Sequence, residues 1–236
     1  LHTEIDMVTT PDGSLVAMVH SNNGTTDLNA WVNLFKEFAD SIGADVDMNQ
    51  MYGTLYNKAL EGDADCGGIL SYGNYAGEPI TNVEKGRPMV VRTPETKFTL
   101  ANFMRSHLYT ALGVIKVGMD ILTKDEGVEI DTVLGHGGLF KTKGVGQKVL
   151  ADAINTPVVV METAGEGGPW GMAILAEYMV KRAEGEKLED YLKNKVFGSN
   201  AGSRIDPDPK GVAGYEAFME TYKKGLDVER RACADL

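Results

Sequence analysis

The chain has 236 residues, and a typical domain takes roughly 100 to 200, so the sequence can form one large domain or two small ones. It carries 23 Lys and Arg against 34 Asp and Glu, a net charge of −11 that repels nucleic-acid phosphates and anionic lipid. These numbers exclude a broad nucleic-acid-binding or membrane-binding surface. A small anion can still bind, because backbone N–H groups supply positive potential whatever the net charge.

The two cysteines, Cys66 and Cys233, are too few for a disulfide framework or a metal cluster. Neither they nor the four histidines show ligand spacing, so we predict no metal site and two free thiols in the reducing cytoplasm. No apolar run approaches the ~20 residues of a membrane span, and no signal peptide is recognisable. Leu1 is not an initiator Met, which indicates a processed chain or a fragment.

A hairpin and a helix are predicted first along the chain. Apolar runs at 5–9 and 14–20 flank the turn signal Pro11-Asp12-Gly13, which predicts two paired strands. A polar loop at 21–26 leads to a helix from about Asp27 to Gly43. The three- and four-residue spacing of its apolar side chains predicts a buried face of Trp31, Leu34, Phe35, Phe38 and Ile42.

The middle of the chain predicts two more helices separated by two strands. A helix from 48 to about 62 is followed by short strands at 67–72 and 89–92 and by a helix from about Thr99 to Lys124. Gly113 and Gly118 inside this last helix each cost about 1 kcal/mol relative to Ala, which favours close approach of another backbone over simple tolerance. Its predicted buried face comprises Leu100, Phe103, Met104, Leu108, Ala111, Leu112, Ile115 and Leu122.

From Ile130 onward, strands and helices alternate. The predicted elements are strand 130–134, helix 144–155, strand 158–161, helix 169–183, helix 188–196 and a last helix after Asp208-Pro209. The β-branched run at 158–161 is typical of a strand buried on both faces, and Trp31 and Trp170 are most simply core. Early strands followed by alternating helices and strands indicate a single three-layer α/β domain.

The strongest local signal for a ligand is a glycine-rich turn after a strand, Val133-Leu134-Gly135-His136-Gly137-Gly138. Such glycines let a ligand approach the backbone, and the following helix offers unpaired N–H groups. The spacing is neither a Walker A loop nor a full Rossmann fingerprint, so nucleotide contact and a plain tight turn have equal weight. The loop at 165–168 more simply lets the next helix pack closely. No nucleophile, base and orienting group can be assembled, so no catalytic residue is predicted.

Three segments follow, in order, the motifs of one known family. Residues 133–138 with 147–158 resemble an adenosine motif of two or three glycines, a small polar residue and Q-x-x-A-D-x-x-G-x-P-V. Residues 171–176 resemble the subsequent G-A-A-x-x-A helix, and residues 70–79 resemble an upstream Y-L-x-G-E-R-x-P loop. The chain thus resembles the FGGY carbohydrate kinases over nearly its whole length, with xylulokinases the most similar branch.

The resemblance implies a ribonuclease H-like, actin-like ATPase fold, an α/β domain with a mixed central sheet and helices on both faces. Residues 1–236 would be the C-terminal, nucleotide-binding domain of a two-domain sugar kinase whose N-terminal domain is absent. The intact enzyme would use ATP and Mg²⁺ to phosphorylate a ketose such as xylulose, or a related sugar or polyol. The family's D-x-G-T loop, its catalytic Asp and its G-T-S loop are absent, so this chain alone is expected to phosphorylate no sugar.

The resemblance also assigns the nucleotide contacts and the partners. Gly137 and Gly138 would face adenine and ribose, Thr142 would place a polar side chain near adenine, and Gly24 would lie in a loop near the nucleotide. The partners would be ATP, the sugar and the protein's own N-terminal domain, with a homodimer also allowed. Two other classes stay open at this point, a binding-only actin-like module and a Rossmann-type cofactor-binding enzyme.

Overall fold

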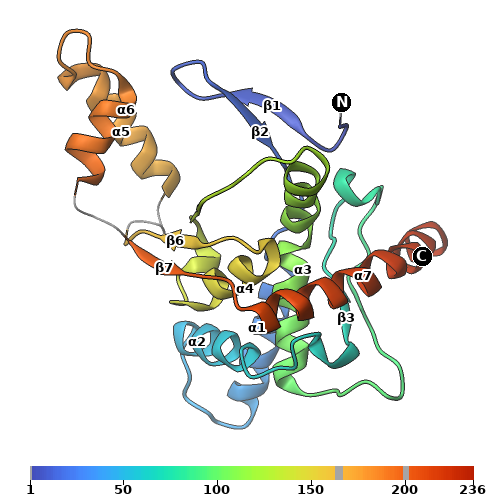
Figure 1. The fold of residues 1–236 in the computed structure, drawn as a ribbon. Helices are drawn as coiled ribbons and strands as arrows, with labels where there is room; N and C mark the ends of the chain where they lie inside the picture. The colour runs from blue at the N-terminus through green and yellow to red at the C-terminus, as the bar shows by residue number, and fades with distance from the viewer. Residues whose placement is uncertain (1, 163–166, 199–201) are drawn as a thin grey trace.

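The computed structural model describes residues 2–162, 167–198 and 202–236, which form a mixed α/β structure (Figure 1). The helices are α1 (Thr26–Ser41), α2 (Met48–Ala59), α3 (Leu100–Asp120), α4 (Val145–Ile154), α5 (Gly167–Lys181), α6 (Leu188–Tyr191) and α7 (Pro209–Asp235). π-helical turns extend α3 through Asp125 and α6 through Phe197. All the helices predicted from the sequence are therefore present. The predicted glycine loop at 165–168 lies partly outside the described residues.

The described strands are short and make three separate sheets. Strands β1 (Asp6–Thr9) and β2 (Leu15–Met18) form the predicted antiparallel hairpin, and β3 (Leu70–Tyr72) pairs antiparallel with β4 (Met89–Val91). In the third sheet, β6 (Val158–Val160) lies between β5 (Val133–Gly135), to which it is parallel, and β7 (Ser203–Ile205), to which it is antiparallel. Strand β7 was not predicted, because its residues Ser203-Arg204-Ile205 include a single apolar side chain and form no apolar run.

Helix α3 runs through the middle of the molecule and packs against α1, α2 and α4, while α7 crosses it and packs on α4 and β3 (Figure 1). Two buried tyrosines join α7 to its neighbours. The hydroxyl of Tyr215 donates a hydrogen bond to the Tyr109 carbonyl oxygen on α3 at 2.6 Å, and the hydroxyl of Tyr72 on β3 donates to the Tyr222 carbonyl oxygen at 3.0 Å. These contacts join α7 to α3 and β3, and the buried apolar cluster extends from there over α1, α2 and α4.

The predicted buried face of α1 is largely wrong. Leu34, Phe38 and Ile42 are more than half exposed, and the buried residues of α1 include Leu28 and Val32 instead. An apolar stripe on a helix is wider than the contact that one neighbouring helix provides, so spacing alone does not locate the buried edge. The same reason applies on α3, where the predicted core residues Leu100 and Ile115 are 41% and 37% exposed. Trp31 and Trp170 are half-buried rather than core.

The packing also corrects the expected close approach of a backbone at Gly113 and Gly118 and the expected burial of β6 on both faces. At Gly118, an added Cβ would overlap the side chain of Val19, so the close approach is to a side chain and not to a backbone. At Gly113 the nearest atom to an added Cβ is the Met219 sulfur at 3.7 Å, which is ordinary contact and indicates tolerance. Strand β6 is central in its sheet, but only Val158 among its residues is fully buried.

Candidate functional site

A cavity of about 540 Å³ lies between the turn after β5 and the first two helices. It brings together segments more than 80 residues apart in the sequence. Its lining residues are Thr25, Asn29, Asn49, Tyr52, Gly53, Tyr56, Gly138, Leu139, Lys141 and Thr142. Of the four predicted contact residues, Gly138 and Thr142 line this cavity. Gly24 and Gly137 do not line it, but each immediately precedes a residue that does.

The turn after β5 depends on glycine at specific positions. Gly137 has φ +107° and ψ −178°, a region that is essentially restricted to glycine, and Gly144 has φ +81° at the start of α4. Gly135 packs against the ring of Phe140, where an added Cβ would come within 2.7 Å of a ring carbon. The backbone therefore turns sharply out of the sheet and enters a short 3₁₀ helix at Gly138–Phe140.

Gly138 itself is different, because the fold gives no local reason for glycine there. Its φ lies outside the left-handed region, and an added Cβ would have no heavy atom within 4 Å. A glycine that the backbone and its neighbours do not require, at the wall of a cavity, favours close approach of a ligand. This geometry supports ligand contact over the plain tight turn that the sequence left as an equal alternative.

The opposite wall is made by α1 and α2. The Tyr52 hydroxyl donates a hydrogen bond to the Asn29 Oδ1 at 3.0 Å, and the rings of Tyr52 and Tyr56 meet edge to face with centroids 5.6 Å apart. Burial raises the pKa of Tyr56 further above physiological pH. Asp47 and Gln50 form a capping box that fixes the start of α2 and with it the position of these side chains.

The chemistry of the lining suits a planar, polar-edged ligand. Aromatic rings, side-chain amides and hydroxyls alternate around the cavity, with Lys141 as the one charged residue and no carboxylate among the lining residues. The volume falls within the roughly 300–1,000 Å³ of small-molecule sites. A ligand that joins a heteroaromatic ring to an anionic group matches this lining. The ring could pack on the aromatic side chains and bond the polar ones, and the anionic group could lie near Lys141.

A buried carboxylate holds the loop that leads into this cavity. Glu78 is completely buried, and its Oε2 accepts hydrogen bonds from the Ser21 hydroxyl and the Asn22 backbone at 3.0 Å each. The same oxygen accepts from the backbone and side-chain amides of Asn23 at 3.3 and 3.2 Å. Asn23 in turn accepts from the Tyr75 backbone at 2.9 Å. Glu78 thereby fixes the chain just before Gly24 and Thr25.

Only Gly138 and Thr142 among the lining residues were predicted from the sequence. The lining residues that were not predicted are Leu139 and Lys141 beside them, and Thr25, Asn29, Asn49, Tyr52, Gly53 and Tyr56 on the opposite wall. Helix α2 reads as an ordinary amphipathic helix, so no local signal marks Tyr52 or Tyr56 as site residues. Glu78 had a signal, its place in the Gly77-Glu78-Pro79 segment, but its role as an anchor required the fold.

The described residues offer neither a metal-binding cluster nor a membrane-spanning helix. Within residues 2–162, 167–198 and 202–236, no group of three or more His, Cys, Asp or Glu side chains is arranged to hold a metal ion. None of the helices described there combines the length and apolarity needed to cross a membrane.

Comparison with known proteins identifies the domain. The model of the C-terminal domain of the FGGY family of carbohydrate kinases matches residues 1–180. No curated protein sequence matches the chain.

Solved structures match nearly the whole chain at low identity. Xylulose kinase from Rhodospirillum rubrum is 16% identical, with a TM-score of 0.69 over 96% of this chain and 42% of that protein. Gluconate kinase from Lactobacillus acidophilus is 18% identical, with a TM-score of 0.67 over 95% of this chain and 42% of that protein. Plasmodium falciparum glycerol kinase with ADP is 17% identical, with a TM-score of 0.60 over 92% of this chain and 38% of that protein.

These matches confirm the predicted actin-like ATPase fold and exclude the Rossmann alternative. The central sheet that the sequence analysis expected is represented, in the described residues, by the small mixed sheet of β5, β6 and β7. The chain spans about two fifths of the length of the structures that it matches.

Proposed function

Because the chain belongs to the FGGY family of carbohydrate kinases, we propose that it forms the adenosine-binding part of an ATP-dependent sugar kinase. The cavity between Gly138 and Tyr52 is the proposed nucleotide site. The observation that carries this proposal is the open space in front of Gly138, a residue that the backbone and its neighbours do not require to be glycine.

The cavity residues would hold adenosine as follows. Gly138 allows the base and ribose to approach the backbone, and Thr142 with Asn29 offers polar groups at the rim. The ring of Tyr52 gives an aromatic surface next to the base, and the absence of a carboxylate from the lining avoids repulsion of the phosphates. Gly24 and Gly137 act indirectly, because each sets the backbone next to a lining residue. Phosphoryl transfer depends mainly on such positioning and on charge neutralisation.

The rest of the active site would come from the remainder of a longer polypeptide. The proposed substrate is a ketose such as xylulose, or a related sugar acid or polyol, in line with the names of the matched kinases. The protein's N-terminal domain would supply the base and most of the sugar contacts. Mg²⁺, held by the intact two-domain enzyme, would enter with the ATP phosphates and neutralise their charge. We place the reaction in the cytoplasm, where both cysteines would remain free thiols.

Replacement of Gly138 by Val tests the site. The added side chain meets no protein atom near its Cβ but projects toward the proposed nucleotide, so ATP affinity should fall by at least about tenfold with little change in melting temperature. Gly171→Val is the matched control, since Gly171 on α5 also has open space at its Cβ and lies outside the cavity. Calorimetric titration with ATP measures both. Unchanged ATP affinity in Gly138→Val would remove the nucleotide from this cavity.

Turnover tests the wider proposal. The 236-residue chain should release no ADP with pentuloses, hexuloses, sugar acids or polyols, whereas the longer kinase polypeptide should do so with one of these classes. Nucleotide binding without turnover in the longer polypeptide would instead identify a binding-only actin-like module. Sugar-dependent turnover by the 236 residues alone would contradict the division of the active site between two domains.

A further inference from the structure

A groove of about 420 Å³ lies where α1, the end of β4 and the start of α3 meet. Four aromatic rings line it, those of Trp31 and Phe35 on α1 and those of Phe98 and Phe103 around the start of α3. No described residue lines both this groove and the nucleotide cavity. The groove is therefore a separate feature of the surface, with its own set of side chains.

The rings of the groove hold one another in place. Phe103 is the centre of the cluster. The rings of Trp31, Phe35 and Phe98 each meet it edge to face, with centroid distances of 4.7, 6.1 and 6.2 Å. Trp31 is fixed further by the buried carboxylate of Asp27, whose Oδ2 accepts a hydrogen bond from the indole Nε1 at 3.2 Å. A surface arranged in this way loses little side-chain freedom when a ligand binds.

Part of this aromatic cluster is nevertheless open to solvent. Phe98 is 55% exposed, and Leu100, which also lines the groove, is 41% exposed. The volume of the groove falls within the roughly 300–1,000 Å³ of small-molecule sites. Rings that their neighbours orient but do not cover favour a small ligand with an apolar body.

A single cation lines the groove. The guanidinium carbon of Arg92 lies 4.5 Å from the centroid of the Phe98 ring. Within the described part of the chain, no carboxylate pairs with Arg92, and none is among the residues that line the groove. Because the chain as a whole carries a net charge of −11, this arginine is a local site of positive charge that complements an anionic group.

The groove offers few hydrogen-bonding side chains. Thr99 supplies the one hydroxyl among its described lining residues, and that oxygen already accepts a hydrogen bond from the Asn102 backbone at 3.2 Å. The nucleotide cavity instead has side-chain amides and hydroxyls, including those of Asn29, Asn49 and Thr142. This difference favours a hydrocarbon ring in the groove over a nucleobase or a sugar, whose polar edges would be left without partners.

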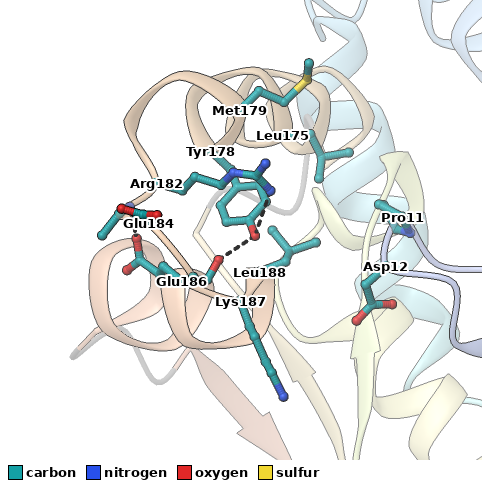
Figure 2. A pocket seen from close by; sticks show the side chains of 12 residues that line it. Pro11, Asp12, Leu175, Tyr178, Met179, Arg182, Glu184, Glu186, Lys187 and Leu188 are labelled. Atoms are coloured by element: carbon teal, nitrogen blue, oxygen red, sulfur yellow. Dashed lines mark hydrogen bonds between the residues drawn. The ribbon is translucent and has the colours of Figure 1, made fainter.

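A larger hollow beside α5 and α6, of about 1160 Å³, shows why the absence of carboxylates matters (Figure 2). Arg182 there also lies over an aromatic ring, with its guanidinium carbon 5.2 Å from the Tyr178 centroid. Glu184 and Glu186 line the same hollow, however, and their charges would repel an anion. Of these two hollows, only the groove combines an arginine over a ring with a lining free of carboxylates.

We propose that the groove is a second ligand site, which takes a carboxylic acid with an aromatic hydrocarbon body. The ring of the ligand would pack against Trp31 and Phe98, and its carboxylate would pair with the Arg92 guanidinium. The inference does not rest on the proposed nucleotide site, because it uses other residues and another class of ligand.

Indole fluorescence tests the proposal directly, because Trp31 lines the groove. The chain has two tryptophans, so Trp170→Phe leaves Trp31 as the single reporter. Titration with phenylacetate should change the Trp31 emission saturably. Phenylacetamide has the ring without the charge, and acetate has the charge without the ring. Each should require at least about a tenfold higher concentration for half of the change, because each makes only one of the two contacts.

Two pairs of variants assign the binding to the groove. Arg92→Gln should weaken phenylacetate binding at least about fivefold, whereas Arg182→Gln, which removes the other arginine over a ring, should leave it unchanged. Phe98→Ala should weaken it by a similar factor, whereas Phe38→Ala, at an exposed phenylalanine outside the groove, should not. All four positions are exposed, so these variants should keep the fold, which thermal melts verify.

Several results would overturn the proposal. Phenylacetate that gives no saturable change would remove the site, and phenylacetamide that binds equally well would leave a plain apolar surface. ATP that displaces phenylacetate would place the nucleotide in the groove. Trp31 emission that changes with protein concentration alone would assign the groove to a second copy. Calorimetric titration that detects phenylacetate on the 236-residue chain but not on the longer kinase polypeptide would show that the rest of the kinase covers the groove.

Discussion

The contact between α3 and α7 and the pairing of β1 with β2 bury their apolar side chains to opposite extents. Along the first contact, Tyr109, Tyr215 and Phe218 are all at most 2% exposed, and the ring of Tyr109 on α3 lies 4.2 Å from that of Tyr215 and 5.3 Å from that of Phe218 on α7. Along the second, no strand residue is buried. The difference separates a contact that forms part of the hydrophobic core from a hairpin whose strand side chains remain exposed.

The largest expected effect compares two phenylalanines, one from a covered region and one from an open surface. Phe218→Ala should lower the free energy of unfolding by about 3–5 kcal/mol, because it removes a fully buried ring from the contact between α3 and α7. Phe38→Ala, at a position that is 63% exposed on α1, should change it by less than about 0.5 kcal/mol. Urea unfolding of both variants measures the difference. Equal losses would show that α1 is covered in solution.

The features that could be predicted from the sequence are those set by residues acting at their own positions in the backbone. The turn Pro11-Asp12-Gly13 located the hairpin, and the glycine at 144 marked the start of α4, because these residues act through the backbone at their own positions. The buried side of α1 could not be predicted, since it depends on where α3 passes. For the same reason the sequence located Gly138 and Thr142 but not Tyr52, which reaches the cavity only through the packing of α2.

A smaller effect should separate the two adjacent glycines of the nucleotide turn. Gly137→Ala forces an L-residue into φ +107°, which should cost about 1–3 kcal/mol of stability. Gly138→Ala meets neither backbone strain nor a neighbouring atom, so its stability should be unchanged. Thermal melts in the absence of nucleotide compare the pair. A stable Gly137→Ala variant would mean that this turn adopts another conformation in solution.

The core contains a buried glutamate, Glu229, whose effect on the stability of the fold depends on pH. Burial raises the pKa of Glu229 on α7, partly offset by hydrogen bonds from Asn74 and the Arg87 backbone. The folded state therefore holds this proton more tightly than the unfolded state. Stability from the group is present at acid pH and is lost as the pH rises through the folded pKa.

Replacement of Glu229 by Gln should accordingly raise the melting temperature at pH 7, by less than the strain at Gly137 lowers it. The gain should shrink as the pH falls from the raised folded pKa toward 4.5, the ordinary value for a glutamate, and should vanish below 4.5, where both states of the wild type are protonated. Melting temperatures of wild type and variant from pH 4 to 8 measure this. A variant that melts lower at pH 7 would show that the charged carboxylate stabilises the fold.

The smallest expected effect concerns the wall that sequence reasoning missed. Tyr52→Phe keeps the ring but removes the hydroxyl that donates to Asn29 at 3.0 Å, so Asn29 loses the bond that orients its amide toward the cavity wall. A neutral hydrogen bond contributes about 0.5–1.5 kcal/mol, so ATP affinity should weaken by roughly two- to tenfold. Tyr52→Leu should weaken it further, because the aromatic surface is lost as well. Titration of both variants with ATP therefore divides the contribution of Tyr52 between its hydroxyl and its ring, and unchanged affinity in both would place the nucleotide against Gly138 without contact to α2.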